Sequence, residues 1–133
     1  MGRRRSVIDA TEKVLRFDLA LEVFANATCS IVLGDTLADA WAYARAEWPS
    51  IDASYDPGDD ACVIEIDGRC VMLVSRPLQV DVLAHEAVHV AAWILSSRGM
   101  PFDDGRSQES VAYLVQWVVR NAWARAQCVT PCD

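Results

Sequence analysis

Two histidines lie four residues apart in the run His85-Glu86-Ala87-Val88-His89, and the chain contains no others. Residues i and i+4 of an α-helix share one face, so both imidazoles can bind one divalent cation. Glu86 sits at the edge of that face, where a carboxylate can reach a metal-bound water without being a ligand. The pattern therefore predicts a helical zinc site with a general base. The alternative is a buried helix with two hydrogen-bonded histidines.

A catalytic zinc ion takes three protein ligands and keeps one position for water. Because no histidine remains, the third ligand must be Glu, Asp or Cys. Glu109 lies twenty residues after His89, near the start of the next expected helix, and a helical hairpin that folds back would bring it to the motif. Acids are also common in a first helical turn for electrostatic reasons alone. We predict His85, His89 and Glu109 as the metal ligands. Asp103 and Asp104 are rivals that suit capping or outer-shell contacts better.

Tyr113 follows Glu109 by four residues and shares its helix face. A phenol there can donate a hydrogen bond to a developing oxyanion or hold a ligand carboxylate, so we count Tyr113 with the catalytic candidates. Packing between helices is the ordinary alternative. Trp93 and Trp117 extend the same two faces, and we interpret them as core or pocket wall.

The motif is expected in the middle of a helix that directly follows a β-hairpin. Strong turn chemistry at Asp67-Gly68 indicates the hairpin, and apolar residues nearly all round the following helix predict that the motif is buried and its polar groups paired. The sequence as a whole predicts one α+β domain over residues 1–133 with a small antiparallel sheet. The expected elements are a weak helix over 6–16, strands over 17–25, 29–33, 61–66 and 69–75, and helices over 36–48, 78–98 and 107–127.

Composition excludes several classes of protein. The chain of 133 residues is 53% hydrophobic and 23% charged, which is typical of a globular domain rather than a disordered one. A net charge of −7 argues against a nucleic-acid partner, and no apolar run is long enough to span a membrane. The basic start, Arg3-Arg4-Arg5, is not followed by an apolar stretch, so we expect no secretion signal. Five cysteines, an odd number, then favour free thiols and a cytoplasmic location. A metal site at Cys128 and Cys132 is a less favoured alternative.

The motif and the later Glu109 together resemble the gluzincin group of zinc peptidases. The segment from Leu83 to Ala91, followed by Glu109-Ser110-Val111-Ala112-Tyr113-Leu114-Val115, also resembles small metallopeptidases encoded by bacteriophages and prophages. The resemblance covers residues 78–120. It implies a minimal zincin-like fold, zinc bound by His85, His89 and Glu109, and Glu86 as the general base. Ala92 and Leu95 stand where the metzincin class requires glycine and histidine, which excludes that class.

These observations predict zinc-dependent hydrolysis of peptide bonds, with a peptide or protein as the partner and the host cytoplasm as the location. The strand 69–75 or its hairpin partner is expected to align an extended peptide along a free edge. One alternative is a non-catalytic metal-binding or assembly factor of the same fold, although such a protein has no need of Glu86. Another is a metal-dependent amidase that acts on cell-wall peptides. The sequence does not identify the substrate or the oligomeric state.

Overall fold

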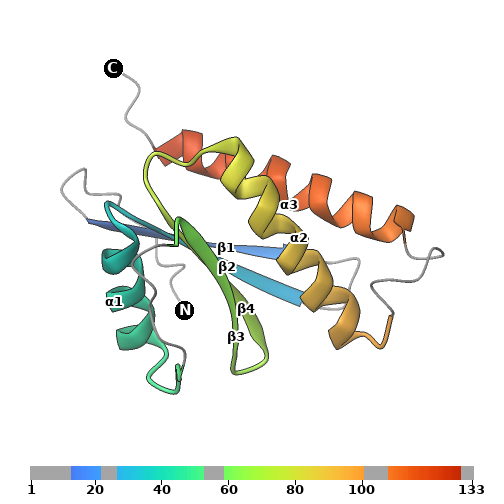
Figure 1. Cartoon of the computed structure of the whole chain (residues 1–133), viewed down its shortest axis with the longest axis horizontal. Coiled ribbons are helices and arrows are strands. Elements are labelled where there is room, and N and C mark those ends of the chain that lie inside the picture. The colour runs from blue at the N-terminus through green and yellow to red at the C-terminus, as the bar shows by residue number, and fades with distance from the viewer. Residues whose placement is uncertain (1–12, 22–26, 53–58, 101–107, 130–133) are drawn as a thin grey trace, which may run out of the picture.

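A computed structural model describes residues 13–21, 27–52, 59–100 and 108–129 of the chain. These residues form four strands and three helices, which confirms an α+β protein (Figure 1). Their bounds are β1 Val14–Leu21, β2 Ala27–Gly34, α1 Leu37–Glu47, β3 Ala61–Ile66, β4 Arg69–Ser75, α2 Val80–Ser97 and α3 Gln108–Val129.

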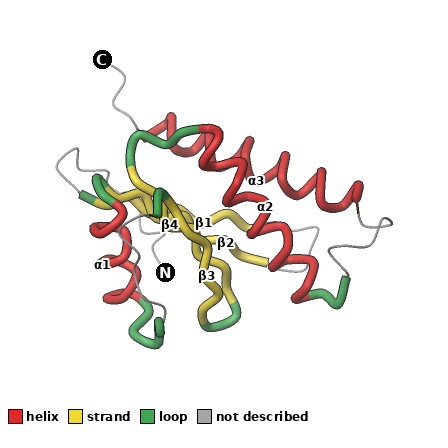
Figure 2. Tube along the Cα trace, in the orientation of Figure 1, coloured by secondary structure: helices red, strands yellow, loops and turns green. Residues whose placement is uncertain are grey.

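The four strands form one sheet in the order β1-β2-β4-β3 (Figure 2). β1 pairs antiparallel with β2, and β3 pairs antiparallel with β4. The central pair, β2 and β4, is parallel, so the predicted antiparallel sheet is wrong in this respect and the sheet is mixed. The physical reason is the connection between these two strands. α1 carries the chain from β2 to β3, which runs antiparallel to β2 at the edge of the sheet. The hairpin after β3 then reverses the chain, so β4 lies beside β2 in the parallel sense.

The sheet lies between two helical layers. α1 covers one face, and α2 and α3 cover the other (Figure 1). Successive side chains of the central strands point to opposite faces of the sheet. Ile31 packs in the cluster beneath α2 and α3, whereas Val32 packs in the cluster beneath α1. Burial on both faces explains why β2 and β4 are apolar almost without interruption.

The predicted hairpin turn is confirmed, and local signals also bound two of the helices. Asp67 and Gly68 have φ of 50° and 74°, as a two-residue hairpin turn between β3 and β4 requires. Thr36 caps α1, since its hydroxyl accepts a hydrogen bond of 3.1 Å from the backbone N–H of Asp39. Gly99 follows α2 with a positive φ of 69°, a conformation that glycine adopts without strain.

The expected helix over residues 6–16 is wrong for residues 14–16, which belong to β1. Val14 is paired with Gly34, and Leu15, Phe17, Leu19 and Leu21 are buried at every second position. This period of two, which starts before the predicted strand, outweighs weak helix propensity. No helix within the described ranges is long and apolar enough to cross a membrane.

Candidate functional site

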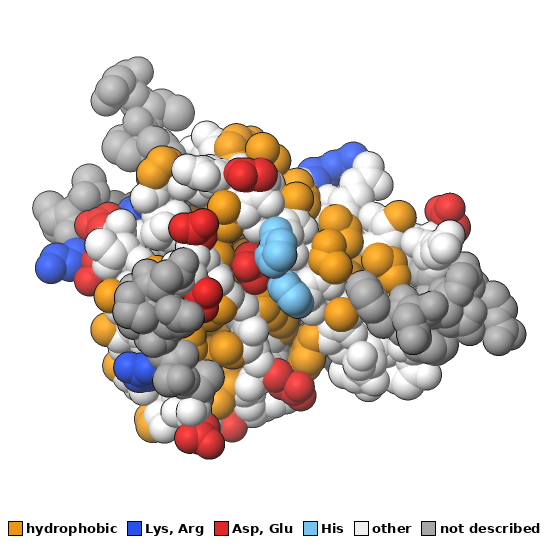
Figure 3. Space-filling model, in the orientation of Figure 1, with side chains coloured by type: hydrophobic (Ala, Val, Ile, Leu, Met, Phe, Trp, Pro, Cys, Tyr) orange, Lys and Arg blue, Asp and Glu red, His pale blue; other side chains and the backbone are white. Residues whose placement is uncertain are grey.

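His85 and His89 lie side by side on the outer face of α2. Their ring centroids are 5.2 Å apart and their planes meet at 62°, which confirms that the two imidazoles share one helix face. Figure 3 shows the pair at the surface, with acidic side chains nearby. Both histidines are exposed, so the expectation that they are buried is wrong. α2 buries the opposite face, which carries Leu83, Ala87, Val90, Ala91, Ile94 and Leu95, and the apolar Val88 is itself 40% exposed.

Glu86, unlike the two histidines, is buried, with 6% of its surface exposed. Burial raises the pKa of its carboxyl group, the two neighbouring imidazoles partly lower it again, and the charge of Asp59 raises it. Within the described part of the chain the carboxyl group has no hydrogen-bond donor from another side chain or the backbone. A raised pKa makes the carboxylate of Glu86 a stronger proton acceptor than that of an exposed glutamate.

A cavity of about 400 Å³ opens beside the motif. It lies between the residues that lead into β3 and the first turns of α2. Its lining residues are Asp59, Asp60, Ala61, Asp81, Val82, His85 and Glu86. Four of these seven carry carboxyl groups and none is Lys or Arg, so the cavity beside the motif is strongly electronegative.

The edge of the sheet nearest the motif is β3. Among the strands that the structure describes, β3 pairs with β4 alone, whereas β4 is flanked on both sides, by β2 and β3. The sequence leaves open which hairpin strand has the free edge, and the structure assigns it to β3. α2 packs on β3, and the strand begins at Ala61, which also lines the cavity. A free strand edge, a cavity and the two histidines therefore adjoin one another.

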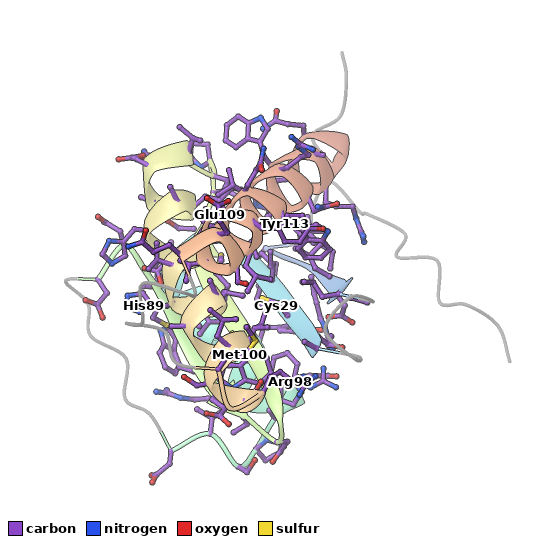
Figure 4. All side chains as sticks on the ribbon, turned by 90° about the vertical axis from the view of Figure 1, so that its right-hand side faces the viewer. Cys29, His89, Arg98, Met100, Glu109 and Tyr113 are labelled. Atoms are coloured by element: carbon purple, nitrogen blue, oxygen red, sulfur yellow. The ribbon has the colours of Figure 1, made fainter. Side chains whose placement is uncertain are left out.

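Glu109 and Tyr113 lie on α3, and both are exposed, Tyr113 by 48%. Figure 4 shows them on α3, with His89 on the flank of α2. Among the described residues no three His, Cys, Asp or Glu side chains converge to hold a metal ion, so the structure does not bring Glu109 to the histidines. The reason lies in the length of α2. It continues from His89 to Ser97, about 12 Å along the axis at 1.5 Å per residue, and only then does the chain turn toward α3.

Asp103 and Asp104, the rival ligands, lie outside the described residues, as does the predicted turn over 101–105. Trp93 and Trp117 are partly buried and pack against the core beneath α2 and α3, which confirms their interpretation as core or wall. Tyr113 is not among the described residues that pack against this core, and 48% of it is exposed.

The cysteines that the structure describes behave as predicted. Cys29, Cys62 and Cys70 are free thiols, and Cys62 and Cys70 are not paired in the hairpin, where Cys62 stands opposite Leu73. Burial, together with the charges of Glu86 and Asp59, raises the pKa of Cys62 to about 12. Cys132 lies outside the described residues, and the placement of the Cys128 side chain is not described either.

The acids of the cavity are functional candidates that the sequence reading missed. Asp59 and Asp60 directly precede β3. Asp81 precedes His85 by four residues, as His85 precedes His89, so one helix face carries all three. This spacing is visible in the sequence, whereas the approach of Asp59 to α2 depends on the tertiary fold.

No family model matches this sequence, and comparison with curated proteins and with solved structures likewise finds no match.

Proposed function

We propose that the chain is a zinc-dependent hydrolase of peptide bonds, in which α2 supplies two metal ligands and the general base. One observation carries this proposal: two exposed imidazoles, with ring centroids 5.2 Å apart, share a helix with a buried glutamate that lines a cavity together with His85. Imidazole is a preferred zinc ligand, and two of them one helical turn apart are compatible with a single ion. The donor types therefore fit zinc.

The residues of the chain have distinct roles in such a reaction. Bound zinc lowers the pKa of its water and polarises a carbonyl group. Glu86 accepts the proton of the attacking water and returns it to the leaving amine, for which a raised pKa suits a carboxyl group. His85 and His89 are both exposed, so a metal ion and a substrate have access to them.

The free edge of β3 is suited to hold the substrate. An extended peptide can add to an unpaired strand through backbone hydrogen bonds, and alternate side chains then point to the same face of the sheet. On β3, Ala61 and Val63 face the helical layer that contains α2, whereas Cys62 and Ile64 face α1. A peptide on this edge therefore presents every second side chain to the side of the motif.

The third metal ligand stays a prediction, and it has two candidate donors: Glu109 on α3, or one of Asp103 and Asp104 in the preceding segment. Glu109 supplies it only if the start of α3 approaches the histidines more closely than the described conformation allows. Asp103 and Asp104 follow Ser97 by six and seven residues, a length of chain that spans about 20 Å when extended at 3.3 Å per residue. That exceeds the distance of about 12 Å from the end of α2 back to His89 along the axis. The two sources are separable by Glu109→Gln and by the double change Asp103→Asn with Asp104→Asn.

The test measures metal and turnover separately. The purified protein is loaded with zinc, and its metal content and its hydrolysis of a peptide library are compared with and without chelator. We expect about one zinc per chain, loss of zinc in His85→Ala and in His89→Ala, and retained zinc without hydrolysis in Glu86→Gln. Glu65→Gln, which changes an exposed acid on β3, is the matched control and keeps both.

Zinc retained in both histidine variants would overturn the metal site. Unchanged hydrolysis in Glu86→Gln would overturn the assigned base. Loss of zinc in only one of the two third-ligand variants identifies the missing donor.

A second candidate function is a metal-binding or assembly factor without catalysis. The observation in its favour is that only two metal donors are gathered at the motif among the described residues. The buried Glu86 argues against it, because binding alone gives no reason to bury a carboxyl group next to the ligands. Bound zinc without hydrolysis of any library peptide would favour this candidate.

A further inference from the structure

We propose that the acidic cavity beside the motif is a subsite for the side chain of a lysine or arginine in a bound peptide. This inference rests on the proposed function in one respect, namely that the ligand of the site is a peptide. It goes further in naming the chemistry that the site selects.

The charge of the cavity favours a cationic occupant. Asp59, Asp60, Asp81 and Glu86 line the cavity, and none of the described residues that line it is Lys or Arg. Within the described part of the chain none of these acids takes part in an ion pair; the three pairs there join Arg16 to Asp18 and Glu47, and Arg76 to Asp35. Like charges this close repel one another, and a cation between them relieves the repulsion.

Glu86 also favours a cationic occupant of the cavity, independently of the exposed acids. Its side chain is 94% buried, as follows from its exposed fraction of 6%, and it reaches the cavity wall without a described hydrogen-bond donor. Buried carboxyl groups in folded proteins are almost always paired with a donor or a cation. A partner that enters the cavity from outside would meet this need.

The arrangement of the acids favours a basic side chain over a metal ion as the occupant of the cavity. The acids line a cavity of about 400 Å³. Among the described residues they do not converge into a group of three that could hold a metal ion. Ala61 and Val82 add apolar wall between the acids. Lysine and arginine bury an aliphatic stem along such a wall while several acceptors contact the charged end, and arginine has five N–H donors to distribute.

The position of the cavity at the start of β3 favours a side chain of a bound peptide as its occupant. Asp59, Asp60 and Ala61 lead directly into β3, whose outer edge is unpaired in the sheet. A peptide added to that edge turns alternate side chains toward α2, and one of them then lies at the start of β3, over the cavity. The same arrangement brings its backbone past His85, which lines the cavity as well. The basic side chain would thus fix the register of the peptide relative to the motif.

The experiment measures peptide binding to the full chain in the presence of chelator, so that hydrolysis does not interfere. The probes are three fluorescent peptides of one alanine-rich sequence that differ at a single central residue: arginine, leucine or glutamate. We expect the arginine peptide to bind at least tenfold more tightly than the other two in fluorescence anisotropy. We expect the preference to shrink at high salt, because Coulomb attraction between accessible charges is screened.

The matched variants localise the effect. The double change Asp59→Asn with Asp81→Asn removes two exposed cavity charges and should reduce the preference for arginine at least fivefold. Asp39→Asn removes one half-buried acid on α1, at the other face of the sheet, and should leave the preference unchanged. Circular dichroism of each variant confirms that it is folded.

Equal affinity for the arginine and leucine peptides would overturn the proposal, as would a preference that survives the double change. Competition by millimolar Mg²⁺ or Ca²⁺ at constant ionic strength would show a site for a metal ion and would also overturn it. The outcome is distinct from that of the proposed function. A preference for arginine in a protein without turnover leaves the subsite standing, whereas turnover without any basic preference removes the subsite alone.

Discussion

Replacement of Glu86 by glutamine is expected to stabilise the metal-free protein while it abolishes hydrolysis. Only 6% of Glu86 is exposed, and loss of hydration disfavours its charged form. Glutamine has nearly the same shape and no charge. The substitution therefore removes the cost of a buried charge and leaves the packing of α2 on the sheet intact.

The expected gain is about 1 kcal/mol in the free energy of unfolding at pH 8. A buried polar group without a partner costs about 1–3 kcal/mol, and a charged one more. We take the lower end because the amide of glutamine is also left without a partner and because the two imidazoles offset part of the cost for the carboxylate. The exposed control Glu65→Gln should stay within about 0.5 kcal/mol of the unchanged protein.

The pH dependence has a definite sign. The pKa of Glu86 is higher in the folded than in the unfolded chain, so the folded state takes up the proton first as the pH falls. The penalty is therefore complete above the folded-state pKa and disappears below the unfolded value of about 4.3. Asp59 and Cys62 from β3 and its approach, and His85 and His89 from α2, are the titratable groups that act on it. The advantage of the variant should thus be largest at pH 8 and vanish near pH 4.

Urea unfolding followed by circular dichroism, with chelator present, gives both free energies by linear extrapolation. An unchanged or lower stability of Glu86→Gln at pH 8 would refute the argument, as would an advantage that grows as the pH falls. In the first case Glu86 would have a compensating partner in the folded chain. In the second case the order of its two pKa values would be reversed.

Three further outcomes test the fold around the site. Gly34→Ala should lower the free energy of unfolding by about 1–3 kcal/mol, because its Cβ would lie 2.7 Å from the backbone nitrogen of Ala40; unchanged urea unfolding would contradict the close approach of β2 and α1. Leu83→Ala, beneath the motif, should cost about 2–5 kcal/mol in the same assay, whereas the exposed Val88→Ala should cost under about 0.5 kcal/mol. Cys62, with its pKa raised to about 12, should react with iodoacetamide far more slowly at pH 8 in the folded protein than in urea, as mass spectrometry of its peptide would show; equal rates would disprove the protected thiol.

Local signals predict the elements of this fold well. The Asp67-Gly68 turn, the Thr36 cap and the glycine after α2 each act over a few residues, and each is found where the sequence indicates. The parallel pairing of β2 with β4 is different. It joins Cys29 to Cys70 across an intervening helix and strand, and a continuous apolar run does not specify the direction of its partner.

The same division runs through the candidate site. The side-by-side histidines follow from the spacing of i and i+4 alone, and the structure bears this out. Glu109 depends on where α2 ends and on how α3 returns, because every additional turn of α2 moves the start of α3 about 5.4 Å further from the motif along the axis. The spacing of twenty residues fixes neither quantity. For that reason the sequence predicts half of a metal site more securely than the whole.

The arrangement around α2 shows why an occupant is expected. Folding has placed four carboxyl groups and the imidazole of His85 around one cavity, with His89 beside His85 on α2. A cation held by the histidines and a basic side chain held by the acids would both offset the repulsion among these carboxyl groups. If so, zinc and a basic peptide should each raise the stability of the folded chain by mass action, and Glu86→Gln should reduce the stabilisation by the peptide more than the stabilisation by zinc.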